Sequence, residues 1–477
     1  MNRALRRVAI AVLVMFGTLL VNANVVQVGK AESLKNDPRN SRVLLSEYSH
    51  QRGPIIVDGH AIAMSRKTND AYKYLRVYPG GDLYAPVTGY YSLLVGATGI
   101  EKAENSILSG DSDKLFVRRI SDYFTGRQPQ GGQVVLTLDS RAQQAAYDAL
   151  AGKRGAVVAL NPQTGAVLAM VSRPSYDPTP LTTHDTKQIQ QSYNGLLHEG
   201  DSPLLNRATS QTYPPGSTFK VITTAAALSS GHFQPDSQLP APDKLALPQT
   251  THKLENFEGE QCSGGGKITL ADALRVSCNT AFGALGLQLG GDRINKQAEA
   301  FGFGRDIQVP LPVAPSVFPG DVTGPNVAFA AIGQDSDAVT PLQMAMVAAG
   351  VANRGIVMKP HLVAKTLAPD LSTLSVTKPE ELGRAVSPQV ATELTQMMQG
   401  VVQSGTGTAA QIPGVAVAGK TGTAENVPGQ PTHAWFICFA PAQNPQVAVA
   451  VIVEHGGTGG TTAAAIARQV MAAVLGR

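Results

Sequence analysis

Two β-rich runs early in the chain and three near its end constrain the fold most. Residues 156–160 and 166–171 are joined by the turn sequence NPQTG, which is typical of a hairpin. Three further strands are predicted at 415–424, 434–439 and 447–454, followed by an alanine-rich helix at 461–475. We expect an α+β fold in which all five strands form one antiparallel sheet closed by the C-terminal helix. The largely helical region between the second and third strands would then be an insertion.

The N-terminal segment is predicted to cross a membrane. Arg3, Arg6 and Arg7 precede residues 8–28, which carry no charged side chain and are mostly apolar. About 20 apolar residues span a bilayer as a helix, and basic residues ahead of them favour a cytoplasmic N-terminus. A signal peptide cleaved near residues 21–23 is the alternative, but the length of the segment favours an uncleaved anchor. Either interpretation places the rest of the chain outside the cytoplasm.

The length of 477 residues accommodates an anchor and two folded parts. We predict an anchor at 1–28, a small non-catalytic α+β or β-rich pedestal module at 29–150, and one large domain at 151–477. In the pedestal, a strand is expected at 134–138 and a helix at 140–150. The net charge, 39 − 35 = +4, is too small to indicate nucleic-acid binding. Three cysteines without a Cys/His cluster indicate no metal site, and we expect no cofactor.

The first candidate for chemistry is the pair Ser217 and Lys220. A Pro-Pro-Gly turn precedes Ser217, and residues 218–228 are predicted to form an apolar helix. The start of a helix favours developing negative charge. A buried lysine one turn further on loses its proton more easily and can activate the hydroxyl. The plain alternative is a serine cap followed by an ordinary lysine.

The second candidate is the triplet Ser277-Cys278-Asn279, which lies between helices predicted at 269–276 and 280–289. A serine hydroxyl can relay protons, and an asparagine amide can donate and accept hydrogen bonds to a peptide. Taken alone, the triplet is better explained as a turn in which Asn279 caps the second helix.

The third candidate is Lys-Thr-Gly-Thr at 420–423, which continues the strand that begins at residue 415. Lys-Thr-Gly occurs nowhere else in the chain. Gly419 and Gly422 would let another backbone approach closely, and such a strand can take an extended peptide as an added neighbour. Lys420 could attract a carboxylate. The alternative is a glycine-weakened edge strand that ends in a loop.

The order of the three motifs is more specific than any one of them. Ser-x-x-Lys recurs at 375–378, in a polar stretch where we expect no function, and Ser-x-Asn recurs at 192–194. However, Ser-x-x-Lys at a helix start, Ser-x-Asn 60 residues later and Lys-Thr-Gly on a late strand form a recognised set. This set is the signature of acyl-serine enzymes that act on D-alanyl peptides and β-lactams.

The chain resembles class B penicillin-binding proteins over nearly its whole length. Besides the three motifs, the resemblance rests on RGPI at 52–55, GIE at 99–101, the stretch 326–360 and GTGT at 405–408. It implies a penicillin-binding transpeptidase (β-lactamase-like) domain, with a five-stranded antiparallel sheet flanked by helices. It also implies that the pedestal is a dimerisation module.

The resemblance implies D,D-transpeptidation in cell-wall synthesis, and in cell division or shape. Ser217 would attack the penultimate D-Ala carbonyl of a peptidoglycan stem peptide, terminal D-Ala would leave, and an amine of a neighbouring stem would resolve the acyl-enzyme. Lys220 is implied as the general base and Ser277 as the proton shuttle. β-Lactams would acylate Ser217. Lipid-linked glycan strands and a SEDS-type glycan polymerase are the implied partners.

The same resemblance assigns residues that bind substrate. Asn279 and Thr423 would hold the peptide, Lys420 and Thr421 its carboxylate, and Gly422 lies between these threonines. Backbone N–H groups of the nucleophile and of Thr423 would form the oxyanion hole.

Other functions fit the sequence less well. A β-lactamase shares the motifs but needs a base for hydrolysis, and no ExxLN-like segment lies between residues 277 and 420. A D,D-carboxypeptidase differs only in using water as acceptor and is harder to exclude. A β-lactam sensor would need more membrane helices and an effector. A scaffold with a vestigial site is disfavoured because every motif side chain is intact.

The cysteines divide into an expected pair and a single residue. Cys262 and Cys278 lie 16 residues apart in a chain expected to be exported, and we predict that they form a disulfide. The bridge would hold the loop that carries the second motif. Two buried free thiols are the alternative. Cys438, inside a predicted strand, is expected to be buried and reduced.

Overall fold

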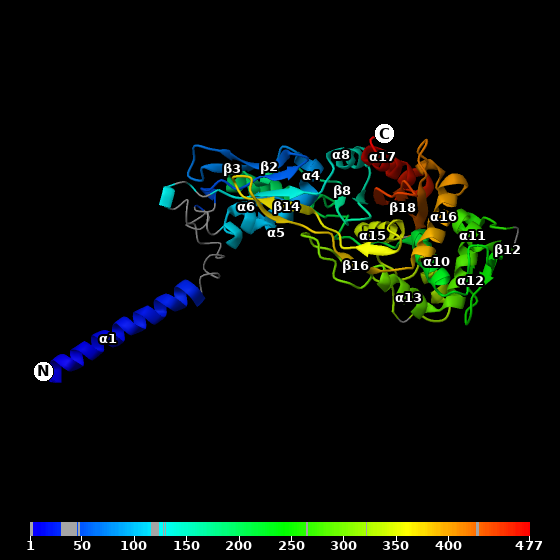
Figure 1. The fold of residues 1–477 in the computed structure, drawn as a ribbon, viewed down its shortest axis with the longest axis horizontal. Coiled ribbons are helices and arrows are strands. Elements are labelled where there is room, and N and C mark those ends of the chain that lie inside the picture. The colour runs from blue at the N-terminus through cyan, green and yellow to red at the C-terminus, as the bar shows by residue number, and fades with distance from the viewer. Residues whose placement is uncertain are drawn as a thin grey trace.

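The computed structural model describes residues 3–29, 45, 48–115, 124–126, 128, 130–263, 266–320, 322–425 and 429–477. At the N-terminus, α1 (Arg3–Asn24) continues into a π-helical turn (Val25–Gly29), and the side chains of both are exposed. Within the described part, this is the one helix long and apolar enough to cross a membrane. It covers the predicted segment 8–28 and stands apart from the folded body in Figure 1.

One five-stranded antiparallel sheet forms the centre of the large domain. Its strand order is β17-β18-β19-β7-β8. The predicted sheet of two early and three late strands is therefore confirmed. The strands are β7 (Gly155–Leu160), β8 (Val167–Arg173), β17 (Ala418–Ala424), β18 (His433–Ala440) and β19 (Val447–Val453).

Helices cover both faces of this sheet, which explains why β19 is apolar throughout and β18 nearly so. On one face, Trp435 and Ile437 of β18 pack in the core that contains α15 (Pro341–Ala352). On the other face, Phe436 and Cys438 pack against α17 (Ala464–Val474) and α8 (Ser140–Ala149). Alternate side chains of a strand point to opposite faces, so a strand buried on both sides can be apolar at every position, as β19 is.

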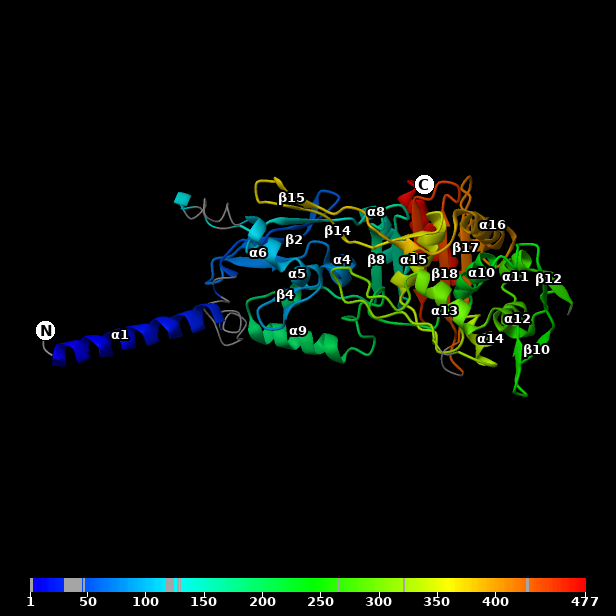
Figure 2. The ribbon, with the colours of Figure 1, turned by 60° about the horizontal axis from the view of Figure 1, so that its bottom comes forward.

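The insertion between β8 and β17 contains helices α9 to α16, and Figures 1 and 2 show α10, α11, α12 and α13 grouped beside the sheet, on the side away from the pedestal. Its remaining helices are α9 (Thr186–His198), α10 (Lys220–Ser229), α11 (Leu270–Val276), α12 (Asn279–Leu289), α13 (Gly291–Ala300), α14 (Asn326–Ala330) and α16 (Pro388–Ser404). Three short antiparallel pairs accompany them: β9 (Gln238–Pro240) with β12 (Lys267–Thr269), β10 (Lys244–Ala246) with β11 (Lys253–Glu255), and β13 (Ile356–Met358) with β16 (Glu381–Arg384).

The pedestal is built on a six-stranded sheet in the order β15-β14-β6-β1-β2-β3. Two of these strands come from the insertion, so the sheet crosses the predicted division at residue 150. Its strands are β1 (Ile55–Val57), β2 (His60–Lys67), β3 (Tyr74–Val77), β6 (Gln133–Leu136), β14 (Val363–Leu367) and β15 (Thr373–Val376). The described part of the pedestal also contains three short α-helices and a two-stranded pair: α4 (Gly81–Thr88), α5 (Gly99–Ala103), α6 (Asn105–Ser109), and β4 (Tyr91–Ser92) with β5 (Gly96–Ala97).

The two sequence motifs of the pedestal meet in a buried ion cluster. Arg52 Nε and Arg76 Nε each lie 2.6 Å from a different oxygen of the Glu101 carboxylate. Tyr78 donates a hydrogen bond of 3.0 Å to the same carboxylate. Since Glu101 is fully buried, two cations and one hydroxyl replace the water that it would otherwise need.

Candidate active site

Ser217 lies on a 3₁₀ turn (Gly216–Phe219) that leads directly into α10. Gly216 N donates to Gly333 O over 2.9 Å, which fixes the turn. Gly216 has a φ of +52°, and a Cβ there would lie 2.8 Å from Thr423 O. The turn therefore requires glycine, and it places Ser217, which is partly exposed, beside β17.

Lys220, the first residue of α10, is fully buried and reaches the second motif. Its Nζ lies 2.7 Å from Ser277 O, 2.6 Å from Asn279 Oδ1 and 3.3 Å from Ser277 Oγ. Burial lowers the pKa of Lys220 well below its ordinary value, and the charge of Lys420 lowers it further. A neutral amine has two N–H groups, which can donate hydrogen bonds to the Ser277 carbonyl oxygen and the Asn279 amide oxygen. The nitrogen lone pair is then available to accept the proton of a hydroxyl.

Ser277 and Asn279 are held where α11 ends and α12 begins. Ser277 has a left-handed backbone conformation, φ 63° and ψ 39°, which few non-glycine residues adopt. The alternative explanation of Asn279 as a helix cap is wrong, because Cys278 occupies the N-cap position and Asn279 is the first helical residue. The Asn279 side chain instead accepts from Lys220 and donates to Glu255 O over 3.2 Å.

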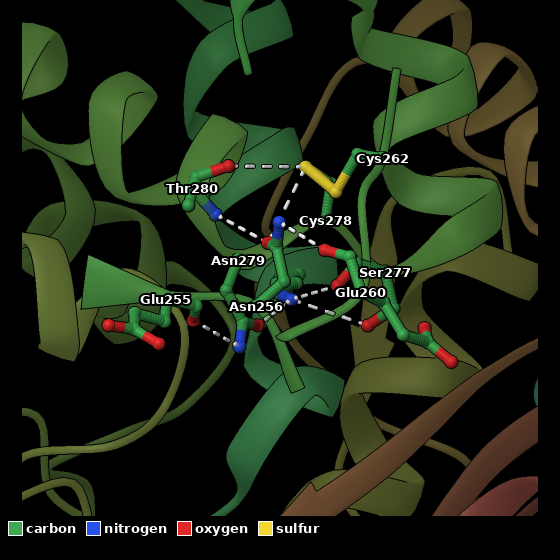
Figure 3. Close-up of a disulfide and its surroundings, with 9 residues drawn as sticks. Glu255, Asn256, Glu260, Cys262, Ser277, Cys278, Asn279 and Thr280 are labelled. Carbon is green, nitrogen blue, oxygen red and sulfur yellow. Dashed lines mark hydrogen bonds between the residues drawn. A yellow bond between two sulfur atoms is a disulfide. The ribbon is translucent and has the colours of Figure 1, made fainter. Parts of the chain in front are cut away.

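The predicted disulfide between Cys262 and Cys278 is confirmed, and Figure 3 shows it beside Ser277 and Asn279. Asn256 supports the same turn, since its Oδ1 accepts from Thr280 N over 3.0 Å. The segment before α12 is thus tied down by a covalent bond and a buried amide. Cys438 is buried and unpaired in β18, as predicted.

Lys420 lies on β17, the edge strand of the sheet, and is fully buried. Its Nζ lies 2.9 Å from Ser277 Oγ, 2.9 Å from Thr421 O and 3.4 Å from Thr421 Oγ1. Burial lowers the pKa of Lys420 to about 7. The hydroxyl of Ser277 therefore lies between the amines of Lys220 and Lys420 and can pass a proton from one neighbouring group to another.

Gly422 and Thr423 bring β17 against the turn that carries Ser217. A Cβ on Gly422 would lie 2.9 Å from Thr218 Cγ2 and 3.1 Å from Pro215 O, so the glycine permits this contact. Thr423 O accepts from Gln334 Nε2 over 3.2 Å. All three sequence motifs thus converge at one site, beside the edge of the sheet.

Behind the nucleophile turn lies a hydrogen-bond network that the sequence did not predict. Tyr213 OH and Arg207 Nε both donate to Glu454 Oε1, each over 2.8 Å, and Trp435 Nε1 donates to Pro214 O over 3.0 Å. These contacts tie the segment before Ser217 to β18 and to the end of β19. The partners are 221 to 247 residues apart, so no local spacing could have revealed them.

The second copies of the motifs lie away from this site. Ser375 is in β15 of the pedestal sheet, 2.7 Å from Thr366 Oγ1, and Lys378 is exposed. Ser192 and Asn194 lie on α9. Among the residues that the structure describes, no group of three or more His, Cys, Asp or Glu side chains could hold a metal ion.

Comparison with known families finds two matches that divide the chain. Residues 155–472 match the penicillin binding protein transpeptidase domain. Residues 52–134 match the penicillin binding protein A dimerisation domain.

Full-length relatives and solved structures agree with these matches. Peptidoglycan D,D-transpeptidase PbpA of Mycolicibacterium smegmatis is 50% identical over 493 residues, covering 100% of this chain and 99% of the relative. PbpA of Mycobacterium tuberculosis is 47% identical over 489 residues, with the same coverage. The ceftriaxone acyl-enzyme of M. tuberculosis penicillin-binding protein A superposes with a TM-score of 0.88 at 46% identity, covering 90% of this chain and 100% of that one. Pseudomonas aeruginosa PBP2 superposes with a TM-score of 0.75 at 33% identity, covering 89% and 95%.

Proposed function

The chain belongs to the penicillin-binding protein family and is a serine-type peptidoglycan D,D-transpeptidase, and we propose that Ser217 is the serine that forms its acyl-enzyme. The observation that carries this assignment is the position of the Ser277 hydroxyl between two buried lysine amines, beside the turn that presents Ser217. The nucleophile and the base come from one segment, the proton relay from a second and Lys420 from a third, and only the fold brings these segments together.

In the acylation step, Ser217 Oγ attacks the carbonyl carbon of the penultimate D-Ala of a stem peptide. Lys220, neutral because it is buried, accepts the proton of the hydroxyl. The new C–O bond forms a tetrahedral intermediate with a negatively charged oxygen. Backbone N–H groups of Ser217 and Thr423 would stabilise that oxygen, a contribution of about 100-fold or more per donor.

Collapse of the intermediate breaks the C–N bond and releases terminal D-Ala. Ser277 would pass the proton from Lys220 to the leaving nitrogen, because its Oγ is within 3.3 Å of Lys220 Nζ. In deacylation, an amine of a second stem peptide attacks the ester and the proton returns by the same route. The products are the cross-link and free Ser217, and β-lactams interrupt the cycle by forming an acyl-enzyme.

Substrate would lie along the outer edge of β17, opposite the edge that pairs with β18. An extended peptide beside an edge strand gains main-chain hydrogen bonds, and Asn279 and Thr423 would bind its amide groups. The terminal carboxylate would bind Lys420, in its protonated form, and the Thr421 hydroxyl. Gly422 keeps the strand close to the nucleophile turn.

We also propose the division of labour in the chain. Residues 1–28 would anchor it with a cytoplasmic N-terminus, which the apolar α1 and its leading arginines support. The pedestal, which is 29–150 without α8 but together with β14 and β15, would be non-catalytic, and the rest of 151–477 with α8 would be the transpeptidase domain. Protease added to protoplasts should degrade the catalytic domain; full protection would contradict this topology.

The family resemblance supports a SEDS-type polymerase as the partner that supplies lipid-linked glycan strands. Cross-linking in membranes between the chain and such a polymerase is the expected result. Absence of any cross-link in cells that express both proteins would remove this proposal.

Labelling with fluorescent penicillin tests the nucleophile. Full-length wild-type protein should become stably labelled and Ser217→Ala should not, while Ser375→Ala, which alters the second Ser-x-x-Lys copy, should label like wild type. Persistence of label in Ser217→Ala would overturn the assignment.

A further inference from the structure

We propose that Thr406 is a positioning residue that orients the hydroxyl of Thr421 toward the carboxylate of the substrate. This inference rests on the carboxylate site proposed above. Thr406 lies in the segment between α16 and β17, and its Oγ1 is 2.6 Å from Thr421 Oγ1. Thr421 is 6% exposed, whereas Thr406 is exposed, so the pair runs from the buried strand to the surface.

The segment that carries Thr406 is closely packed, so the contact between the hydroxyls is maintained by backbone geometry. Thr406 N donates to Arg275 O over 3.3 Å. A Cβ on Gly405 would lie 2.3 Å from Arg275 O, and a Cβ on Gly460 would lie 2.4 Å from Thr406 O. Two glycines therefore allow this segment to press against α11 on one side and the turn before α17 on the other.

The number of protons and acceptor sites on the Thr421 hydroxyl explains the effect of its contact with Thr406. A hydroxyl has one proton and two acceptor sites. Lys420 Nζ, at 3.4 Å, can donate to Thr421 Oγ1. Either hydroxyl of the 2.6 Å pair can be the donor, and in the proposed arrangement Thr406 donates and takes the second acceptor site. The proton of Thr421 is then left for an anion that arrives on the open side. Without the Thr406 hydroxyl, the Thr421 proton has no preferred direction.

The test measures the second-order acylation rate constants of the full-length protein with benzylpenicillin and with its methyl ester, which lacks the carboxylate. Thr406→Val should lower the constant for the acid about tenfold, the effect of one hydrogen bond to a charged group, and leave that for the ester unchanged. Thr406→Ser keeps the hydroxyl and should retain both constants. Thr408→Val, the same substitution at an exposed neighbour, is the matched control. Thr406→Ala is a second variant without the hydroxyl should Thr406→Val unfold.

The possible outcomes distinguish the role of Thr406 from the carboxylate site on which that role rests. If wild-type protein treats acid and ester alike, the carboxylate site at Lys420 and Thr421 is wrong. If wild type prefers the acid and both Thr406→Val and Thr406→Ala keep that preference, only the role of Thr406 is wrong. Equal losses for acid and ester, or loss in Thr406→Ser, would also overturn the role, because either result indicates a structural effect.

Discussion

The pedestal and the active site each bury two cationic side chains, but only the pedestal places a carboxylate between them. Arg52 and Arg76 bind the two oxygens of Glu101. Burial alone would raise the pKa of Glu101, yet Arg76 and Arg52 outweigh it and hold that pKa below its usual value. The three groups therefore remain charged at neutral pH and act as a structural unit.

At the active site, Lys220 and Lys420 share the hydroxyl of Ser277. The other oxygens that accept from them belong to carbonyl, amide and hydroxyl groups, all uncharged. Burial consequently lowers the pKa of both lysines. A buried cation paired with a carboxylate therefore keeps its charge, whereas a buried amine held by uncharged oxygens loses its proton more readily.

The largest effect should follow from removing the base. Lys220→Met keeps the length and apolar packing of the side chain but cannot accept a proton. We expect the rate constant for acylation by benzylpenicillin to fall about 10²- to 10⁴-fold, the usual contribution of a general base. Lys378→Met, at the exposed second copy of the motif, is the matched control and should acylate normally. Normal acylation of a folded Lys220→Met protein would show that Lys220 is not the base.

A large effect on stability should follow from removing the charge in the pedestal. Glu101→Gln leaves Arg52 and Arg76 buried beside a neutral amide. We expect the free energy of unfolding of the pedestal to fall by about 3–5 kcal/mol, as when one partner of a buried ion pair is lost. Chemical denaturation, monitored by a signal from the pedestal, measures this free energy. Glu380→Gln, which breaks the exposed pair with Lys359, should change stability little. Equal effects of the two substitutions would show that Glu101 does not compensate the arginines.

A smaller effect on stability should follow from removing the disulfide that holds the segment carrying Ser277 and Asn279. Replacing Cys262 and Cys278 together by serine removes a bridge of sequence separation 16. We expect a loss of about 3 kcal/mol in the stability of the large domain, from the chain-entropy value for a loop of this length. Reduced wild-type protein is the control and should match the variant. If reduction leaves wild-type stability unchanged, the bridge does not stabilise this region.

The sequence predicted the sheet, the three motifs and the disulfide because each has a local or ordered signature. The apolar run of β18 and the order of Ser217, Ser277 and Lys420 can be read from the sequence alone. Contacts between residues that are distant in the sequence cannot. Glu454 reaches Tyr213 across 241 residues, and β14 joins the pedestal sheet from the middle of the insertion. Packing decides such pairings, and no spacing in the chain encodes them.

In the proposed mechanism, buried Lys220 must be neutral and Lys420 still protonated when Ser217 reacts. The pH dependence of the second-order acylation constant with benzylpenicillin reports groups of the free enzyme and therefore tests this requirement. Because burial lowers the pKa of Lys220 well below its ordinary value, the acid limb of the profile should lie well below the pKa of an ordinary lysine. Deprotonation of Lys420, whose pKa is about 7, weakens carboxylate binding and should lower the rate above that pH. A bell-shaped profile with an alkaline limb near neutrality is the expected result. A rate that keeps rising to the pKa of an ordinary lysine would contradict the account.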